Sequence, residues 1–153
     1  MRKIVLFLVF LFVTTLGFAG TPAQELMQRH SEIKGGRFLA ASGSKMVFVR
    51  PALKRYTIGP MSDSVDEVMV LNMKKTPAQE RQTFMDDMKN TLGNYRYFGK
   101  SGSPDGMTEV YVHMKSDDCV DELVVFNPNT FVLNSLIGNF PVDKLLSLTP
   151  VTE

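Results

Sequence analysis

The chain contains few of the residues that form disulfides or bind metals, with one cysteine and two histidines in 153 residues. Cys119 has no second cysteine with which to form an intrachain disulfide, so packing must hold the fold together. We interpret Cys119 as a small apolar residue at a strand start; an intermolecular disulfide or a reactive thiol are the alternatives. No C-x-x-C, H-x-H or H-E-x-x-H spacing occurs, so the sequence predicts no metal site and no cofactor.

Catalytic patterns are also missing. No G-x-S-x-G elbow is present, and Ser44 directly precedes Lys45 instead of standing at the S-x-x-K spacing. The pairs Asp86-Asp87 and Asp117-Asp118 belong to no D-x-D-x-D-G loop, and adjacent side chains on a helix or strand point in different directions. The sequence therefore favours a protein that is not an enzyme. The alternative is a degenerate polar site built on Tyr111, His113 and Asp117 or Asp118.

The chain is nearly neutral, with 17 Lys and Arg against 16 Asp and Glu and a formal net charge of +1. A nucleic acid or an anionic membrane requires a clustered basic surface, so this balance predicts neither as a partner. The one long apolar run, Ile4 to Val13, is also too short to cross a bilayer, which takes about 20 apolar residues. We expect no transmembrane segment in the mature chain.

That apolar run has the features of a secretory leader. Arg2 and Lys3 precede it, and the small residues Gly17 and Ala19 fill the −3 and −1 positions of a cleavage site. We expect a signal peptide over residues 1–19 and a mature chain of residues 20–153, which is the size of one domain. Residue 20 is glycine, so the protein is not expected to be a lipoprotein. The predicted location is periplasmic or extracellular.

Two helices are predicted from a repeated pentamer. Thr-Pro-Ala-Gln-Glu occurs at Thr21 and again at Thr76, and each copy has the form of a capping box with proline in the first turn. Each start leads into an apolar stripe at helical spacing. Methionines at 27, 85 and 88 fall on these stripes, so we interpret them as core residues and not as Cu(I) ligands.

The remaining pattern is mostly β. Strands are predicted over Arg37–Ala41, Glu67–Met73, Val120–Asn127 and Thr130–Ile137, and Val110, Val112 and Met114 alternate with outward residues. A short final helix is expected from Pro141. Residues 44–56 are ambiguous between helix and strand, and Pro51 predicts that any helix there is kinked or ends near Arg50.

Aromatic residues gather where the β pattern begins. If Tyr95 and Tyr97 point outward beside Tyr111 and His113, the four side chains form a candidate interaction patch, because such residues are enriched at interfaces. The alternative places the two tyrosines in the core against a helix.

Several blocks resemble a known family. The carrying residues are Ser44-Lys45, Val70-Leu71, Asn94-Tyr95-Arg96-Tyr97, Gly106 with Glu109-Val110-Tyr111-Val112, Asp121-Glu122-Leu123-Val124-Val125, Leu136-Ile137-Gly138-Asn139-Phe140 and Asp143-Lys144-Leu145-Leu146. They resemble a domain-of-unknown-function family of small exported bacterial proteins (DUF4252-like). The resemblance implies an α+β fold, a mainly antiparallel sheet with two longer helices and a short C-terminal helix packed on it, and it favours a short helix over Ser44–Arg50. It brings no catalytic or binding set, and many relatives carry the lipid-accepting cysteine absent here.

The functional hypothesis is accordingly an exported, non-enzymatic binding or interaction module of the cell envelope. Its expected partner is an envelope protein, with a role in signalling or stress response. Besides the degenerate enzyme, the sequence leaves open a carrier of a small apolar ligand between helices and sheet. The oligomeric state is open.

Overall fold

The computed structural model describes residues 20–55, 59–103 and 106–148. The leader predicted over residues 1–19 lies outside these ranges. The elements in chain order are α2 (Pro22–Arg29), β1 (Arg37–Ser42), the 3-10 turn η1 (Gly43–Lys45), α3 (Met46–Leu53), the 3-10 helix η2 (Gly59–Ser64), β2 (Val65–Asn72), α4 (Ala78–Leu92), β3 (Arg96–Ser103), β4 (Gly106–Ser116), β5 (Cys119–Asn127), β6 (Val132–Pro141) and α5 (Val142–Leu148).

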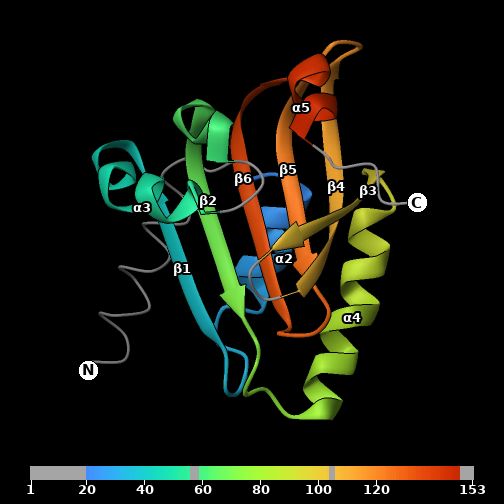
Figure 1. The fold of residues 1–153 in the computed structure, drawn as a ribbon. Helices are drawn as coiled ribbons and strands as arrows, with labels where there is room; N and C mark the ends of the chain where they lie inside the picture. Colours follow the sequence, from blue (N-terminus) through green and yellow to red (C-terminus); the bar gives the residue numbers. More distant parts are fainter. Residues whose placement is uncertain (1–19, 56–58, 104–105, 149–153) are drawn as a thin grey trace.

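The strands form one antiparallel sheet in the order β1-β2-β6-β5-β4-β3 (Figure 1). Three hairpins join β3 to β6, whereas β2 pairs with β6, a strand about seventy residues away in the chain. The α+β class predicted from the sequence is confirmed, including the short C-terminal helix α5. Among the described residues, no helix is both long and apolar enough to cross a membrane.

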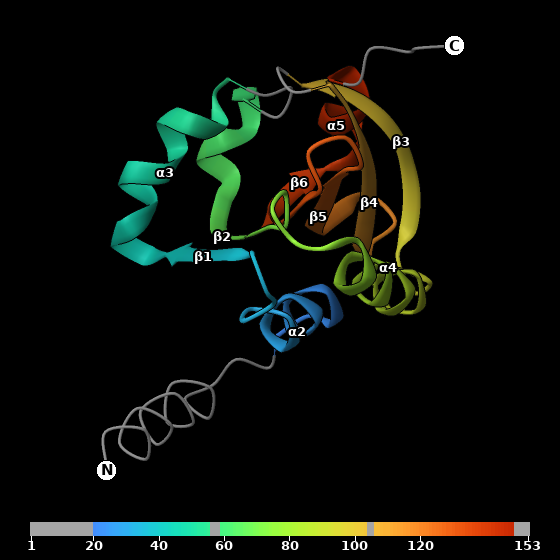
Figure 2. The same cartoon turned by 90° about the horizontal axis from the view of Figure 1, so that it is seen from below.

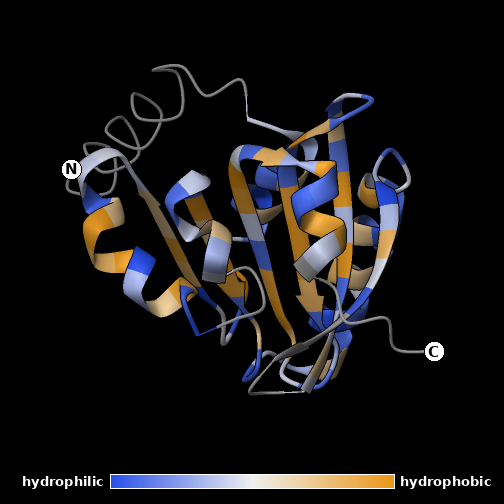
Figure 3. Cartoon of the chain, turned by 45° about the horizontal axis from the view of Figure 1, so that its top comes forward, coloured by the Kyte–Doolittle hydropathy of each residue, from blue (hydrophilic) through white to orange (hydrophobic). Residues whose placement is uncertain are grey.

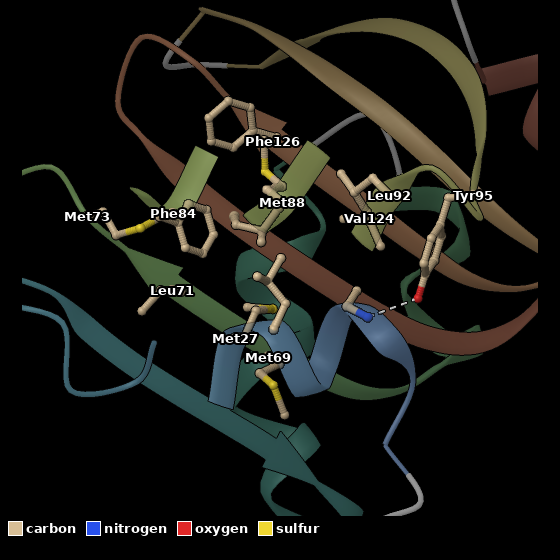
Figure 4. Packing of buried hydrophobic residues seen from close by; sticks show 13 residues of the cluster. Met27, Met69, Leu71, Met73, Phe84, Met88, Leu92, Tyr95, Val124 and Phe126 are labelled. Carbon is tan, nitrogen blue, oxygen red and sulfur yellow. Dashed lines mark hydrogen bonds between the residues drawn. The ribbon is translucent and has the colours of Figure 1, made fainter. Parts of the chain in front are cut away.

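One face of the sheet is covered by α2 and α4 (Figure 2). Phe84, Met88 and Leu92 recur every four residues along α4 and are all buried, as the predicted stripe requires. Figure 4 shows these side chains meeting Val124 and Phe126 of the sheet. We call this cluster the first core; it consists of Ala23, Leu26, Met27, Met69, Leu71, Met73, Phe84, Met88, Leu92, Tyr95, Val124, Phe126 and Leu133.

The opposite face carries a second core under α3, η2 and α5. Its buried members are Met46, Leu53, Met61, Val65, Val68, Val110, Val112, Val120, Leu123, Leu136, Phe140 and Leu145. Each large side chain buried in this way contributes roughly 1.5–3 kcal/mol to folding. The sheet is therefore buried on both faces, although β1 and β3 stay at its edges.

The ambiguous stretch over residues 44–56 folds as helix where it is described. The helix does not end at Arg50, one of the two outcomes expected from Pro51, since α3 continues through Pro51 to Leu53. Met46 and Leu53 are buried at the two ends of α3 and hold it on the sheet. Pro51 lies on the exposed side, where water can hydrate the carbonyl group that the missing N–H leaves unpaired.

The two copies of the pentamer also behave differently. Thr21 forms the predicted capping box with Gln24 at the start of α2. The same prediction for Thr76 is wrong, because α4 has Pro77 at its N-cap and no side-chain cap. Thr76 is buried, and its Oγ1 has no hydrogen-bond partner among the described residues.

Candidate functional site

The most concentrated polar chemistry lies under the first turn of α2. Glu122 of β5 is completely buried there. Its carboxylate accepts hydrogen bonds from the hydroxyl groups of Tyr95 (2.5 Å), Thr21 (2.7 Å) and Ser135 (2.6 Å). The Tyr95 hydroxyl in turn accepts a bond from the Ala23 amide at 3.2 Å, the contact drawn in Figure 4. The N-cap of α2, the residue before β3, and strands β5 and β6 thus meet at one carboxylate.

The surroundings of Glu122 favour a structural role. Burial raises the pKa of Tyr95, and the hydrogen bond to Glu122 and its negative charge raise it further. The phenol therefore stays protonated and remains a donor to the carboxylate. Three hydroxyl donors offset the cost of burying this polar group, and the enclosed side chain offers no surface to a substrate. The cluster fastens α2 to the sheet.

A second contact binds the same turn of α2 to β2. The side-chain amide of Gln24 donates a hydrogen bond from Nε2 to Glu67 Oε2 at 3.3 Å. At its other end, α2 reaches α4 through Asp87, which contacts the His30 ring at 2.8 Å and Arg29 at 3.1 Å. Burial raises the pKa of Asp87, but the hydrogen bonds from His30 and Arg29 outweigh it and lower the pKa below its usual value. The His30 ring also packs edge-on against Phe84, with ring centroids 5.0 Å apart.

The four residues of the predicted patch form two separate ring pairs. Tyr97 packs edge-on against Tyr111, with ring centroids 5.4 Å apart, and Tyr95 packs against His113 at 5.8 Å. Tyr95 is buried in the first core, whereas Tyr97 is 51% exposed. His113 lies at the surface and pairs with Asp121 at 2.7 Å. Only Tyr97 and His113 thus present a substantial exposed surface, so the four do not form one outward patch.

The degenerate enzyme site is not assembled either. Asp117 and Asp118 lie in the β4–β5 turn, where Asp118 accepts from Ser116, and the partner of His113 is Asp121. The nearest polar partner of Tyr111 is Glu109, at 3.4 Å. Within the described ranges, no group of three or more His, Cys, Asp or Glu side chains could hold a metal ion.

Cys119 opens β5, as expected for its position. It is a free, partly exposed thiol, and its Sγ donates to Asn139 Oδ1 of the neighbouring strand β6 at 2.6 Å. This contact gives the thiol a local partner between two central strands of the sheet.

The sequence reasoning missed an exposed apolar surface on α3 and β1. Phe48 is 84% exposed, Val47 65% and Leu39 68%. Leu39 stands opposite Val70, which packs on the second core, so it lies on the same face of the sheet as α3. Figure 3 shows the apolar colouring of α3 at the edge of the molecule. We call these three side chains, with Lys45, Lys54 and Arg55, the α3 surface.

A signal for this surface was present in the sequence. The run Met46 to Val49 is apolar at every position, which suits a buried strand as well as a helix. Once it forms a two-turn helix at the sheet edge, only part of the run can face inward.

Comparison with known proteins gives no relative for this chain. No family model matches it, and no curated protein or solved structure matches it at a significant level.

Proposed function

We propose that this protein is an exported, non-enzymatic binding module that attaches to the cell envelope through the α3 surface. The observation that carries the proposal is the exposure of Phe48 on a helix whose inner side is anchored by Met46 and Leu53. An aromatic side chain held outward by a fixed helix is ready to bind without a prior folding step. Membership of the exported family that the sequence resembles is part of the same proposal.

The distribution of exposed apolar residues supports a dedicated surface. Among the described residues, six large apolar side chains are exposed, and three of them lie on α3 and the adjacent β1. The others, Tyr97, Met107 and Leu146, lie singly on β3, β4 and α5. Scattered exposed apolar residues are ordinary in soluble proteins, whereas a gathered set marks an interaction site.

A binding assay on isolated envelope material tests the proposal. The purified protein is mixed with washed envelopes and sedimented, and the Phe48→Ser variant is compared with Leu146→Ser. Both substitutions remove a large exposed apolar side chain, but only Phe48 belongs to the α3 surface. We expect Phe48→Ser to lower the bound fraction at least about tenfold, in line with the loss of a central contact.

The Leu146→Ser variant should bind like the unchanged protein, and both variants should keep its thermal stability because neither side chain is buried. Equal retention of all three proteins on the envelopes, or retention of none, would overturn the proposal that α3 makes the attachment.

A further inference from the structure

We propose that the α3 surface docks on an anionic lipid surface, with Phe48 and Val47 entering the headgroup region and the neighbouring cations contacting the lipid charges. The inference rests on the proposed function and names the chemistry of the partner. Residues 33–62 contain six Lys and Arg residues and no Asp or Glu, so all 16 acidic residues lie elsewhere. The near-zero net charge, from which we predicted no anionic membrane partner, does not reveal this separation along the sequence; the next acidic residues, Asp63 and Asp66, are exposed on η2 and β2.

Five of these six cations are exposed; they are Lys34, Arg37, Lys45, Lys54 and Arg55. The sixth, Arg50, is turned inward and donates to the Val65 carbonyl at 3.3 Å. Arg50 therefore helps to hold α3 on β2, while the other five remain available at the surface. Lys45, Lys54 and Arg55 flank α3, whereas Lys34 and Arg37 lie before and at the start of β1, the end of this strand away from α3. Cations beside an exposed apolar helix side are the feature from which we infer binding to anionic lipid.

The order of residues along α3 fits a helix that lies on a membrane. Successive residues of a helix turn by about 100°, so Val47, Phe48 and Pro51 fall on one side, opposite buried Met46 and Leu53. Lys45 precedes this outward side, and Lys54 with Arg55 follows it. Apolar side chains flanked by Lys and Arg are typical of helices that rest in the interface. Because α3 has only two turns, the docking is reversible and depends on the cations.

The same features fit other occupants less well. A stable protein interface buries about 800 Å² on each partner, more than three exposed apolar side chains provide. A second copy of this chain would bring the same acid-free cationic stretch to the face and be repelled. An acidic protein is the remaining candidate, and it is left to the experiment.

Vesicle sedimentation tests the lipid proposal. The full chain, with the N-terminus of every preparation determined by intact mass, is mixed with pure phosphatidylcholine vesicles or with vesicles containing 30% phosphatidylglycerol. We expect binding to the anionic vesicles only, weakened by added salt because the contacts are exposed. The triple variant Lys45→Glu, Lys54→Glu, Arg55→Glu should lower the partition coefficient at least about tenfold, and Phe48→Ser should lower it as well.

A matched triple variant controls for net charge. Lys74→Glu, Lys75→Glu, Lys89→Glu makes the same change at exposed sites on the β2–α4 turn and on α4, outside the acid-free stretch. It should bind anionic vesicles nearly as well as the unchanged protein, and residues 1–19 are common to all proteins compared. Equal loss in the two triple variants, or equal binding to neutral vesicles, contradicts the proposal.

The two proposals fail in different ways. Attachment to envelopes that depends on Phe48, without any binding to protein-free anionic vesicles, would leave the binding module in place and assign its partner to an acidic protein. Absence of both would remove the module itself.

Discussion

At the scale of single residues, the burial of Glu122 could not be predicted from the strand pattern of the sequence. The sequence predicts a strand over Val120–Asn127, and β5 covers it. The face that each side chain takes was not predictable, because the register with β6 shifts between Val120 and Glu122. A bulge of this kind inserts a residue and reverses the alternation that follows. Glu122 thereby points into the first core, where only tertiary contacts supply its donors.

The hydroxyl of Tyr95 should contribute measurably to folding. Tyr95→Phe removes one donor from a fully buried carboxylate and the acceptor of the Ala23 amide. We expect the free energy of unfolding to fall by about 1–3 kcal/mol, the usual cost of leaving a buried polar group short of a partner. Urea unfolding followed by circular dichroism measures the change. Tyr97→Phe, at an exposed ring on the next strand, should change it by less than about 0.5 kcal/mol.

The same variant has a pH signature. Burial raises the pKa of Tyr95, so above pH 10 the unfolded phenol ionises while the folded one stays protonated. The contribution of Tyr95 is therefore complete below pH 10 and decreases as the pH rises towards the folded value. The stability gap between the unchanged protein and Tyr95→Phe should narrow over that range, and a gap that widens there would contradict the assigned hydrogen bonds.

At the scale of elements, the two copies of the pentamer show that local sequence alone does not decide how a helix begins; tertiary contacts also do. The same five residues form a capping box at Thr21, but not at Thr76. The Thr76 amide instead donates to the Met73 carbonyl in a turn. Gly35 approaches the backbone of Lys75 and Thr76 so closely that a Cβ there would lie 2.4 Å from the Lys75 carbonyl oxygen. The packing of this turn overrides the local preference for a cap.

Substituting the two threonines should therefore give unequal results. Thr21→Ala removes both the cap of α2 and a donor to Glu122, so we expect a loss of about 1–3 kcal/mol in the free energy of unfolding. Thr76→Val keeps the side-chain shape and removes a hydroxyl group that is buried without a partner within the described ranges, so it should be neutral or stabilising. Thermal and urea unfolding of both variants provide the comparison, and equal losses would show that the two starts work alike.

The first and last residues of the strands likewise depend both on local sequence and on contacts formed in the folded chain. The predicted strand over Arg37–Ala41 agrees with β1 to within one residue. The predicted start of the last strand at Thr130 is wrong, because the Asn127 side chain accepts from the Asn129 and Thr130 amides and extends the turn. Phe131 then takes a positive φ of 58°, and β6 begins at Val132. For these two strands local composition located the element, and at β6 side-chain hydrogen bonding set its start.

At the scale of the whole molecule, the arrangement of the strands was beyond the sequence pattern. Alternation and turn residues indicate hairpins between neighbouring strands, and the β3 to β6 meander follows from them. Nothing local predicts that β2 pairs with β6 and joins the two halves of the chain into one sheet. The α3 surface is a product of the same arrangement, because it places a short apolar helix beside an edge strand.

Whether this molecule reaches an envelope depends on the signal peptide predicted over residues 1–19. We expect the exported protein to have the intact mass of residues 20–153, since Gly17 and Ala19 provide the small residues that signal peptidase requires. The expected cut after Ala19 leaves only Gly20 before Thr21, so processing retains the residues that bind Glu122. Ala19→Arg should block the cut and cause the precursor to accumulate, as intact mass spectrometry of cell fractions can measure.

The neighbouring position provides the control for that variant. In the A-x-A pattern the middle residue is unrestricted, so Phe18→Arg adds the same side chain one residue away and should still be processed. Normal processing of both variants would place the cut elsewhere, and an unchanged protein recovered only from the cytoplasm at the mass of all 153 residues would contradict export. In that case the α3 surface could meet only cytoplasmic partners, and a basic, aromatic helix would be tested first against the inner face of the membrane.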